Sequence, residues 1–154
     1  MLKNIDPVLS PELLKALAEM GHEDAIVLAD ANFTAMRYRA QTTSQVVIRL
    51  PGVSLARAAQ AVLSVLPLGI AQEKPVVYMH VNGAAPDHRN AAQEAVCKQV
   101  QADAANQGIT PQALERFAFY EQAQKAYVIV QTGETAPYAN FIFKKGVLTS
   151  DAGL

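Results

Sequence analysis

Short apolar runs alternate along this chain with segments whose apolar residues recur every three or four positions. The runs at 25–29 and 75–81 are apolar at almost every position, which is typical of strands buried on both faces. The spaced pattern of Leu13, Leu14 and Leu17 indicates a helix with one buried face. We predict strands at 25–29, 45–50, 75–81, 126–131 and 140–144, and helices at 11–20, 55–66 and 86–106.

The predicted helices begin and end at residues with strong positional preferences. Ser10 and Ser54 are suited to accept hydrogen bonds from the first turn as N-caps, and Pro11 suits the first helical position. We expect Gly21 to end the first helix as its C-terminal cap. Pro86 opens the long third helix.

The remaining segments predict loops or leave two conformations open. Residues 31–44 are predicted to form a polar loop, and Thr110-Pro111 to start one short turn. Residues 116–120 fit an extended chain as well as a helical turn.

The order of these elements indicates an α/β fold. Because helices alternate with buried strands, we predict a three-layer α/β/α subunit whose sheet is mostly parallel and lies under helices on both faces. The two late strands are close together in sequence, so we expect them to add an antiparallel member and make the sheet mixed. At 154 residues, the chain is predicted to be a single domain spanning 1–154.

Composition narrows the possible partners. The 13 basic and 14 acidic residues nearly cancel, which gives no field that would attract a nucleic acid. No run is apolar over the length of a membrane span, and the first seven residues lack the apolar core of a signal peptide, so we expect a cytoplasmic protein. A charged fraction of only 18% points to homo-oligomerisation. Cys97, the one cysteine, is expected to be a small packing residue.

Asp30 and His22 are the first two candidates for chemistry. Asp30 follows the apolar run 25–29, and ligands bind at the carboxyl ends of strands in open α/β sheets; an equally good interpretation is that Asp30 caps a turn. His22 follows the Gly21 cap, where helix carbonyls favour a charged imidazole; the alternative is a surface histidine.

The spacing of these two residues poses a geometric difficulty. An extended chain from His22 to Asp30 spans about 26 Å. The two residues can share a pocket within one subunit only if the chain turns near Glu23-Asp24. Otherwise the pocket must be built across a subunit interface.

Two further pairs of polar residues have a spacing that puts them on one face. Arg116 and Tyr120 are neighbours in either an extended chain or a helix, over an aromatic face that we expect to be buried. Tyr138 and Asn140 point the same way in an extended chain, and their hydroxyl and amide can exchange hydrogen bonds with a sugar. Packing of the Arg stem and the Tyr rings is the alternative interpretation.

Other recognisable chemistry is missing from the sequence. His80 and His88 have no third ligand at a suitable spacing, so no metal is predicted. The glycines form neither dinucleotide-binding nor phosphate-binding motifs, and no cofactor is expected. The serine-hydrolase and zinc-hydrolase motifs are also absent.

Six segments taken together resemble the L-fucose mutarotase and D-ribose pyranase family. They are Ser10-Pro11-Glu12-Leu13-Leu14, Gly21-His22, Ala29-Asp30-Ala31-Asn32-Phe33, Arg116-Phe117-Ala118-Phe119-Tyr120-Glu121, Tyr138-Ala139-Asn140 and Lys144-Lys145-Gly146-Val147. The resemblance covers residues 1 to about 148, with a looser middle, and the segment 116–121 is closer to the fucose branch. The sequence departs from the family pattern at two positions that are usually glycine, where it has Glu23 and Ala139.

The resemblance implies a ring of subunits, commonly a decamer of two stacked pentamers, with a monosaccharide site at each subunit contact. It implies His22 as proton donor and Asp30 and Arg116 as sugar ligands. Tyr138, Ala139 and Asn140 match further sugar ligands, through side chain or backbone. Tyr120 is a further catalytic candidate from the same matching segment.

The activity implied is sugar mutarotation by an isomerase. Ring opening and reclosure move one proton off the anomeric hydroxyl and one onto the ring oxygen, which acid/base groups can assist by roughly 10²–10⁴-fold. We assign catalysis to His22, Asp30 and Tyr120, with L-fucose or a related aldose as substrate. The alternatives are pyranose–furanose exchange of D-ribose and a non-catalytic sugar-binding or transport-accessory protein.

Overall fold

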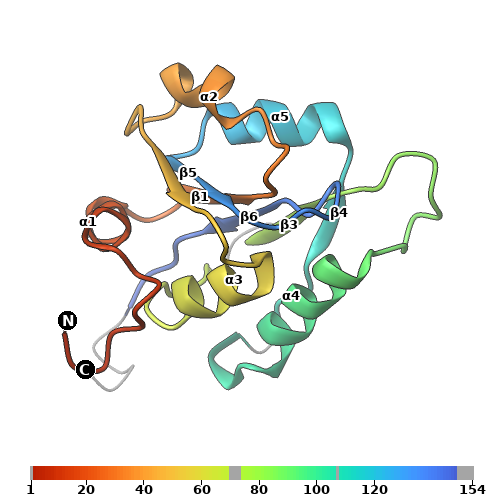
Figure 1. Cartoon of the computed structure of the whole chain (residues 1–154). Helices are drawn as coiled ribbons and strands as arrows, with labels where there is room; N and C mark the ends of the chain where they lie inside the picture. The colour runs from red at the N-terminus through yellow and green to blue at the C-terminus, as the bar shows by residue number, and fades with distance from the viewer. Residues whose placement is uncertain (1, 70–73, 107, 149–154) are drawn as a thin grey trace.

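The chain folds as one mixed sheet between two layers of helices (Figure 1). The computed structural model describes residues 2–69, 74–106 and 108–148. The strands are β1 (Ala25–Ala29), β2 (Val47–Leu50), β3 (Val76–Met79), β4 (Gln112–Leu114), β5 (Val128–Thr132) and β6 (Phe141–Lys144). The helices are α1 (Pro11–Glu19), α2 (Ala35–Tyr38), α3 (Leu55–Leu63), α4 (Ala91–Ala102) and α5 (Arg116–Gln124), with 3₁₀ turns at Arg39–Gln41 and Ala104–Asn106.

The sheet has six strands in the order β2-β5-β1-β6-β3-β4. All neighbouring pairs are parallel except those made by β6, which runs antiparallel to both β1 and β3. This confirms the predicted mostly parallel, mixed sheet. Because β6 is reversed, its amino end lies beside the carboxyl ends of β1 and β3, where Phe141 pairs with Leu28 and Tyr78.

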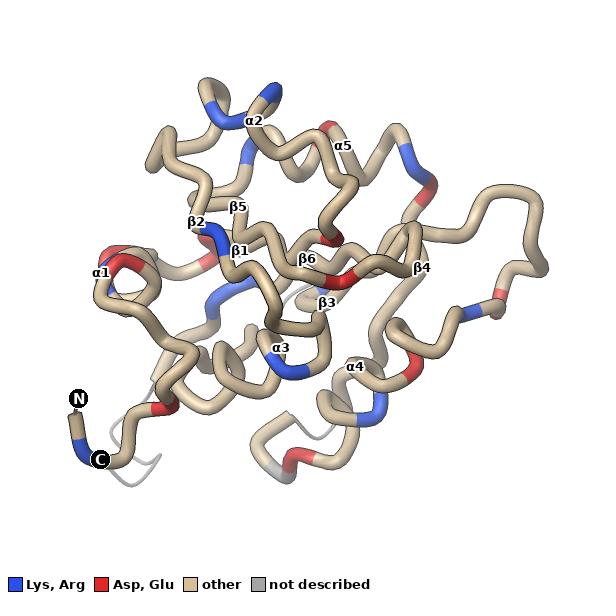
Figure 2. Tube along the Cα trace, viewed as in Figure 1, with Lys and Arg blue, Asp and Glu red and all other residues tan. Residues whose placement is uncertain are grey.

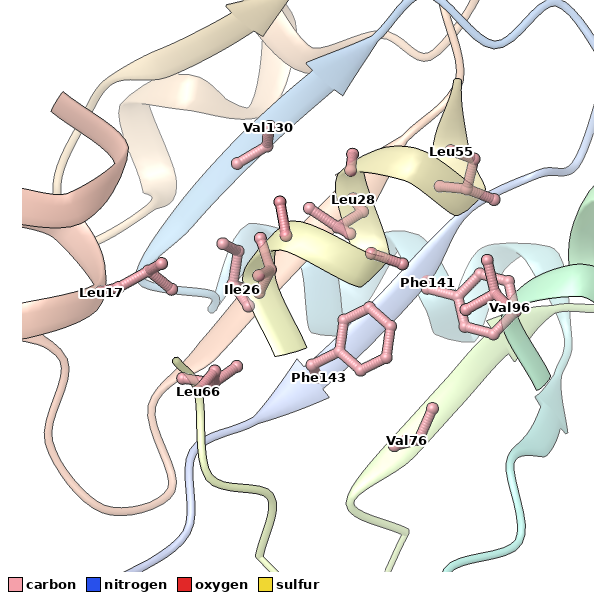
Figure 3. Packing of buried hydrophobic residues seen from close by; sticks show 14 of the residues in the cluster. Leu17, Ile26, Leu28, Leu55, Leu66, Val76, Val96, Val130, Phe141 and Phe143 are labelled. Atoms are coloured by element: carbon pink, nitrogen blue, oxygen red, sulfur yellow. The ribbon is translucent and has the colours of Figure 1, made fainter. Parts of the chain in front are cut away.

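Alternating side chains of the strands fill two separate cores. Figure 3 shows the larger core, in which side chains of β1 and β6 such as Ile26, Leu28 and Phe143 pack against α1, α3 and α4. The intervening residues, among them Val27 and Ile142, face α2 and α5 in the smaller core. Period-two alternation with both faces buried explains the apolar runs, and the α/β/α layering is confirmed.

Short elements account for the wrong predictions of secondary structure. The polar loop predicted at 31–44 contains α2 and a 3₁₀ turn, and the turn predicted at 110–111 leads into β4, a three-residue edge strand paired with β3. Elements of three or four residues carry too little periodicity to be recognised.

Two helix ends also differ from the prediction. The helix expected at 86–106 begins only at Ala91, because a capping box between Asn90 and Gln93 fixes its start. Gly21 is not the cap of α1, which ends at Glu19 with Met20 following. The Lys145 ammonium donates to the Met20 carbonyl at the end of that helix, a partner that local sequence does not reveal.

Positions of charged residues of both signs are scattered along the chain trace rather than gathered in one part of the fold (Figure 2). Within the described parts of the chain, no helix has the length and apolar character needed to cross a membrane. The same residues contain no group of three or more His, Cys, Asp and Glu side chains that could hold a metal ion.

Candidate functional site

A small polar pocket lies at the edge of the sheet where β1 and β3 end and β6 begins. Its volume is about 150 Å³, and it is open to solvent on one side. The lining residues are Asp30, Asn32, Phe33, Met79, Arg116, Tyr120, Pro137, Tyr138 and Asn140. Five of the seven residues predicted for the site therefore meet here. Larger hollows of about 460 and 690 Å³ lie elsewhere, but apolar side chains provide most of their walls.

Asp30 and Asn140 form a closed pair at the centre of this pocket. The Asp30 backbone N–H donates to Asn140 Oδ1 at 2.9 Å, and Asn140 Nδ2 donates to Asp30 Oδ2 at 2.8 Å. The second Nδ2 hydrogen points to Met79 Sδ, 3.8 Å away. Both residues are almost fully buried, at 3% and 2% exposed. The Asn140 side chain is thus committed to orienting the Asp30 carboxylate.

Burial dominates the electrostatics of Asp30. It raises the pKa of the carboxyl above its ordinary value because the charged form loses water. The hydrogen bond from Asn140 lowers that pKa, as does the backbone N–H of Asn32, which donates to Oδ1 at 2.9 Å. The Asx turn foreseen as the alternative for Asp30 is therefore present alongside the pocket position. A buried, oriented carboxyl with a raised pKa is suited to exchanging protons with a hydroxyl.

The first turn of α5 supplies a cation and a phenol. Glu115 caps the helix by accepting from the backbone N–H groups of Phe117 and Ala118, so Arg116 and Tyr120 fall one turn apart on the same side. This settles the ambiguity of residues 116–120 in favour of a helix. The predicted buried aromatic face was wrong for Phe117, which is 62% exposed under the Arg116 guanidinium.

Aromatic rings surround Tyr120 on the apolar side of the pocket. Its ring centroid lies 5.7 Å from that of Phe33 and 5.4 Å from that of Tyr38. Burial raises the pKa of the Tyr120 hydroxyl, although Arg116 acts in the opposite direction. Tyr120 therefore presents a neutral hydroxyl beside a carboxylate and a guanidinium.

The backbone of the segment 137–140 is bent to form the third wall. Tyr138 adopts a left-handed conformation with φ of 63°, which costs about 1–2 kcal/mol in a residue that carries a Cβ. Its half-buried side chain lines the pocket. Ala139 points the other way, into the larger core, and is completely buried. Ala139 is therefore not among the residues that line the pocket, although it was predicted for the site.

His22 does not belong to this pocket within one chain. It lies in an exposed turn before β1, whereas Asp30 follows β1, and five strand residues separate the two edges by about 17 Å. The chain does turn near Glu23, which has φ of 69°, and Asp24 N–H donates to the Gly21 carbonyl. That turn leaves His22 at the opposite edge of the sheet.

Four pocket residues were not predicted for the site, and one of them is Asn32. The other three, Phe33, Met79 and Pro137, supply apolar surface to the pocket. Phe33 lies within a segment already singled out by the resemblance, whereas nothing in the sequence around Met79 distinguishes it from other residues of a buried strand. Cys97 is buried in the larger core, as predicted for a packing residue, and burial raises its pKa to about 11.

The arrangement can perform proton transfer on a small hydroxylated molecule. A carboxyl is able to exchange protons and a guanidinium to stabilise negative charge, and the pocket brings these together with two phenols and apolar side chains. The pocket holds no serine, threonine or cysteine that could act as a nucleophile among its described lining residues.

Comparison with known proteins agrees with this chemistry. Residues 3–148 match the RbsD / FucU transport protein family. The fucose mutarotase of Mus musculus is 43% identical over 152 residues, covering 96% of this chain and 95% of that protein. The crystal structure of FucU from Bifidobacterium longum is 36% identical with a TM-score of 0.84, covering 96% of this chain and 100% of that one. The fucose mutarotase of Streptococcus pneumoniae in complex with L-fucose is 36% identical with a TM-score of 0.80 and the same coverage.

Proposed function

The chain belongs to the RbsD / FucU transport protein family, and from that premise we propose that it is a sugar mutarotase. It is an isomerase that interconverts the α and β anomers of L-fucose or a related aldose. The observation that carries this proposal is the pocket in which the buried carboxyl of Asp30 meets Arg116 and two tyrosines. No external nucleophile is needed, because mutarotation breaks and re-forms only the bond between the ring oxygen and the anomeric carbon.

Proton transfer at the two oxygens of the anomeric carbon is the step to be assisted. Asp30 exchanges a proton with a sugar hydroxyl, and Tyr120 relays a proton at the same end. Arg116 holds hydroxyls and stabilises the negative charge that develops on the departing oxygen. Tyr138 fixes the face of the ring. Asn140 acts by orienting Asp30, because its own donors and acceptor are engaged.

His22 enters the proposal through a second copy of the chain. At the far edge of the sheet it cannot reach the pocket of its own subunit, so we infer that it donates its proton in the pocket of a neighbour. The functional unit is then a homo-oligomer with sites at subunit contacts, and we propose a ring, a decamer of two stacked pentamers, in the cytoplasm.

The experiment that tests the activity is NMR exchange spectroscopy between the anomers of L-fucose, with and without the protein. Faster exchange between α and β pyranose signals is the expected result. A parallel sample with D-ribose tests pyranose–furanose exchange, and acceleration for ribose alone would replace the proposal with that activity.

A second candidate follows from the family description, which calls these proteins transport proteins. A sugar-binding or transport-accessory protein would bind L-fucose without accelerating anomer exchange. Titration of the sugar in the same NMR samples separates the two, because shifted protein signals with an unchanged exchange rate would favour the binding protein.

A further inference from the structure

Gln93 is a fully buried side chain that the proposed chemistry leaves without a role. It lies in the first turn of α4, where the extended green loop in Figure 1 returns to the body of the protein, and it is 0% exposed. Its Oε1 accepts from the Asn90 backbone N–H at 3.0 Å, which completes the capping box of the helix. Capping needs no more than this oxygen and the reciprocal bond from the Gln93 backbone N–H.

The amide nitrogen of Gln93 makes two contacts that capping does not require. Nε2 donates to the Met79 carbonyl at 2.7 Å and to the Tyr138 carbonyl at 2.8 Å. Both residues line the pocket, one at the end of β3 and the other just before β6. The amide therefore uses both of its hydrogens to join the end of β3 to the segment that precedes β6.

The position of the Tyr138 carbonyl depends on the strained backbone of that residue. Because Tyr138 is in the left-handed region, a bond to its carbonyl opposes relaxation to an ordinary conformation. A neighbouring bond acts in the same direction, since Asn90 Nδ2 donates to the Pro137 carbonyl at 2.9 Å. Two consecutive carbonyls of the pocket wall are thus held by two polar side chains at the start of α4.

We propose that Gln93 is a positioning residue for the sugar site, which holds Tyr138 in the conformation that faces the ligand. This inference rests on the proposed function, because it takes the pocket as the place where the sugar binds. Gln93 does not touch the reacting atoms. Its loss therefore raises the KM for L-fucose and has a smaller effect on kcat, because a misplaced Tyr138 weakens binding while Asp30 and Arg116 keep their own supports.

Gln93→Glu is the sharpest variant. A carboxyl retains an oxygen that caps α4 and has at most one hydrogen, so at least one of the bonds to the Met79 and Tyr138 carbonyls is lost. Gln93→Met removes the donors without adding charge, at similar side-chain length. Gln101→Glu is the matched control, since it makes the same substitution at an exposed position of the same helix. We expect KM to rise roughly tenfold in both Gln93 variants, kcat to fall less than about threefold, and the control to match the parent protein.

A second readout does not depend on activity. The backbone chemical shifts and the HN–Hα coupling of Tyr138 report its left-handed conformation by NMR, without sugar. They should change in Gln93→Glu and stay the same in Gln101→Glu. A purely structural role would lower the thermal midpoint while leaving KM and the Tyr138 signals unchanged, and that result would overturn the proposal.

Asn90→Asp keeps the proposal testable if both Gln93 variants fail to fold. Aspartate is a good N-cap, so the helix retains its start, but the donor to the Pro137 carbonyl is lost. A higher KM would support the proposal that side chains at the start of α4 hold the 137–138 wall of the pocket in place. An unchanged KM would overturn it. If the parent protein itself does not accelerate fucose exchange, the proposed function fails, whereas the Tyr138 signals still decide whether Gln93 fixes the pocket wall.

Discussion

Polar residues are held differently at the two ends of the parallel strands, which we call the carboxyl edge, after β1 ends, and the amino edge, before β1 begins. At the carboxyl edge, Asp30 and Asn140 are buried and joined by paired hydrogen bonds. At the amino edge, His22 lies in an exposed turn that backbone bonds secure, such as the one from Glu23 N–H to the Lys145 carbonyl. The carboxyl edge thus holds a buried, ordered polar pair, whereas the amino edge leaves its histidine in an exposed turn.

Removing either His22 or Asp30 should have the largest effect on the rate of anomer exchange. We expect His22→Ala and Asp30→Ala each to lower kcat for L-fucose anomer exchange by roughly 10²–10⁴-fold, the usual contribution of an acid or base group. NMR exchange rates measure this directly. Parent-like rates in either variant would remove that residue from the mechanism.

Mixing the two inactive variants tests whether the edges act across subunits. If His22 serves a neighbour, co-refolded mixed oligomers regain sites that combine an intact His22 with an intact Asp30. For random mixing in equal amounts about a quarter of the sites are complete, because each required residue is present with a chance of one half. A mixture as inactive as its components would contradict an interface-built site.

Asn140→Ala should weaken the carboxyl edge alone. It leaves buried hydrogen-bonding groups of Asp30 unsatisfied, which costs about 1–3 kcal/mol of the free energy of unfolding. It also removes a hydrogen bond that lowers the pKa of Asp30, so this pKa rises further above its ordinary value. The acidic limb of the pH–rate profile, where activity needs the ionised carboxylate, should move to higher pH. A limb that stays in place would mean that Asp30 does not set it.

Gly146→Ala should disturb the amino edge alone. A Cβ at Gly146 would lie 2.3 Å from the Leu68 carbonyl oxygen, so the backbone next to Lys145 must shift. We expect a loss of about 1–3 kcal/mol in chemical denaturation, as for other overpacked sites. The Asp30 pKa should not change. An unchanged stability would show that the segments around Leu68 and Gly146 can move apart without loss of free energy.

Asp6→Asn should have the smallest effect and leave both edges intact. Asp6 accepts two hydrogen bonds from Arg57, at 2.8 and 2.7 Å, which hold the pKa of its carboxyl below the ordinary value of 3.8. A lowered pKa contributes stability above the unfolded value of 3.8 that is lost as pH falls through the folded value. The thermal midpoint should therefore drop slightly at pH 7 and converge with the parent in acid. Anomer exchange should be unaffected, and a changed rate would link this pair to the site.

The strands and helix starts could be predicted where the residues that determine them lie within the same short segment of the sequence. Runs such as Ala25–Ala29 are apolar because both sheet faces are covered, and Ser10 and Ser54 do accept the N-cap bonds expected of them. Asp30 could be placed because the residue after a buried parallel strand lies at a ligand-binding edge. These inferences need only local pattern and general rules of topology.

The remaining features depend on partners distant in sequence. Gln93 bonds to a carbonyl 45 positions away, and Asn140 to a carboxylate 110 positions away, so no window along the chain reveals either contact. The same is true of the amino edge, where the position of His22 depends on how Lys145 joins the turn. The resemblance to a known family identified the polar residues, but their division between two edges required the fold.

The place of β6 in the sheet has a consequence for how the protein is made. β6 follows the other described strands in the sequence, yet it joins β1 to β3. β5, made just before it, joins β1 to β2. The first 127 residues therefore contain four strands of which only β3 and β4 pair with each other. Contacts between early and late segments dominate the sheet, which slows folding. The two halves of the sheet should therefore remain separate in a nascent chain until β5 and β6 have been synthesised.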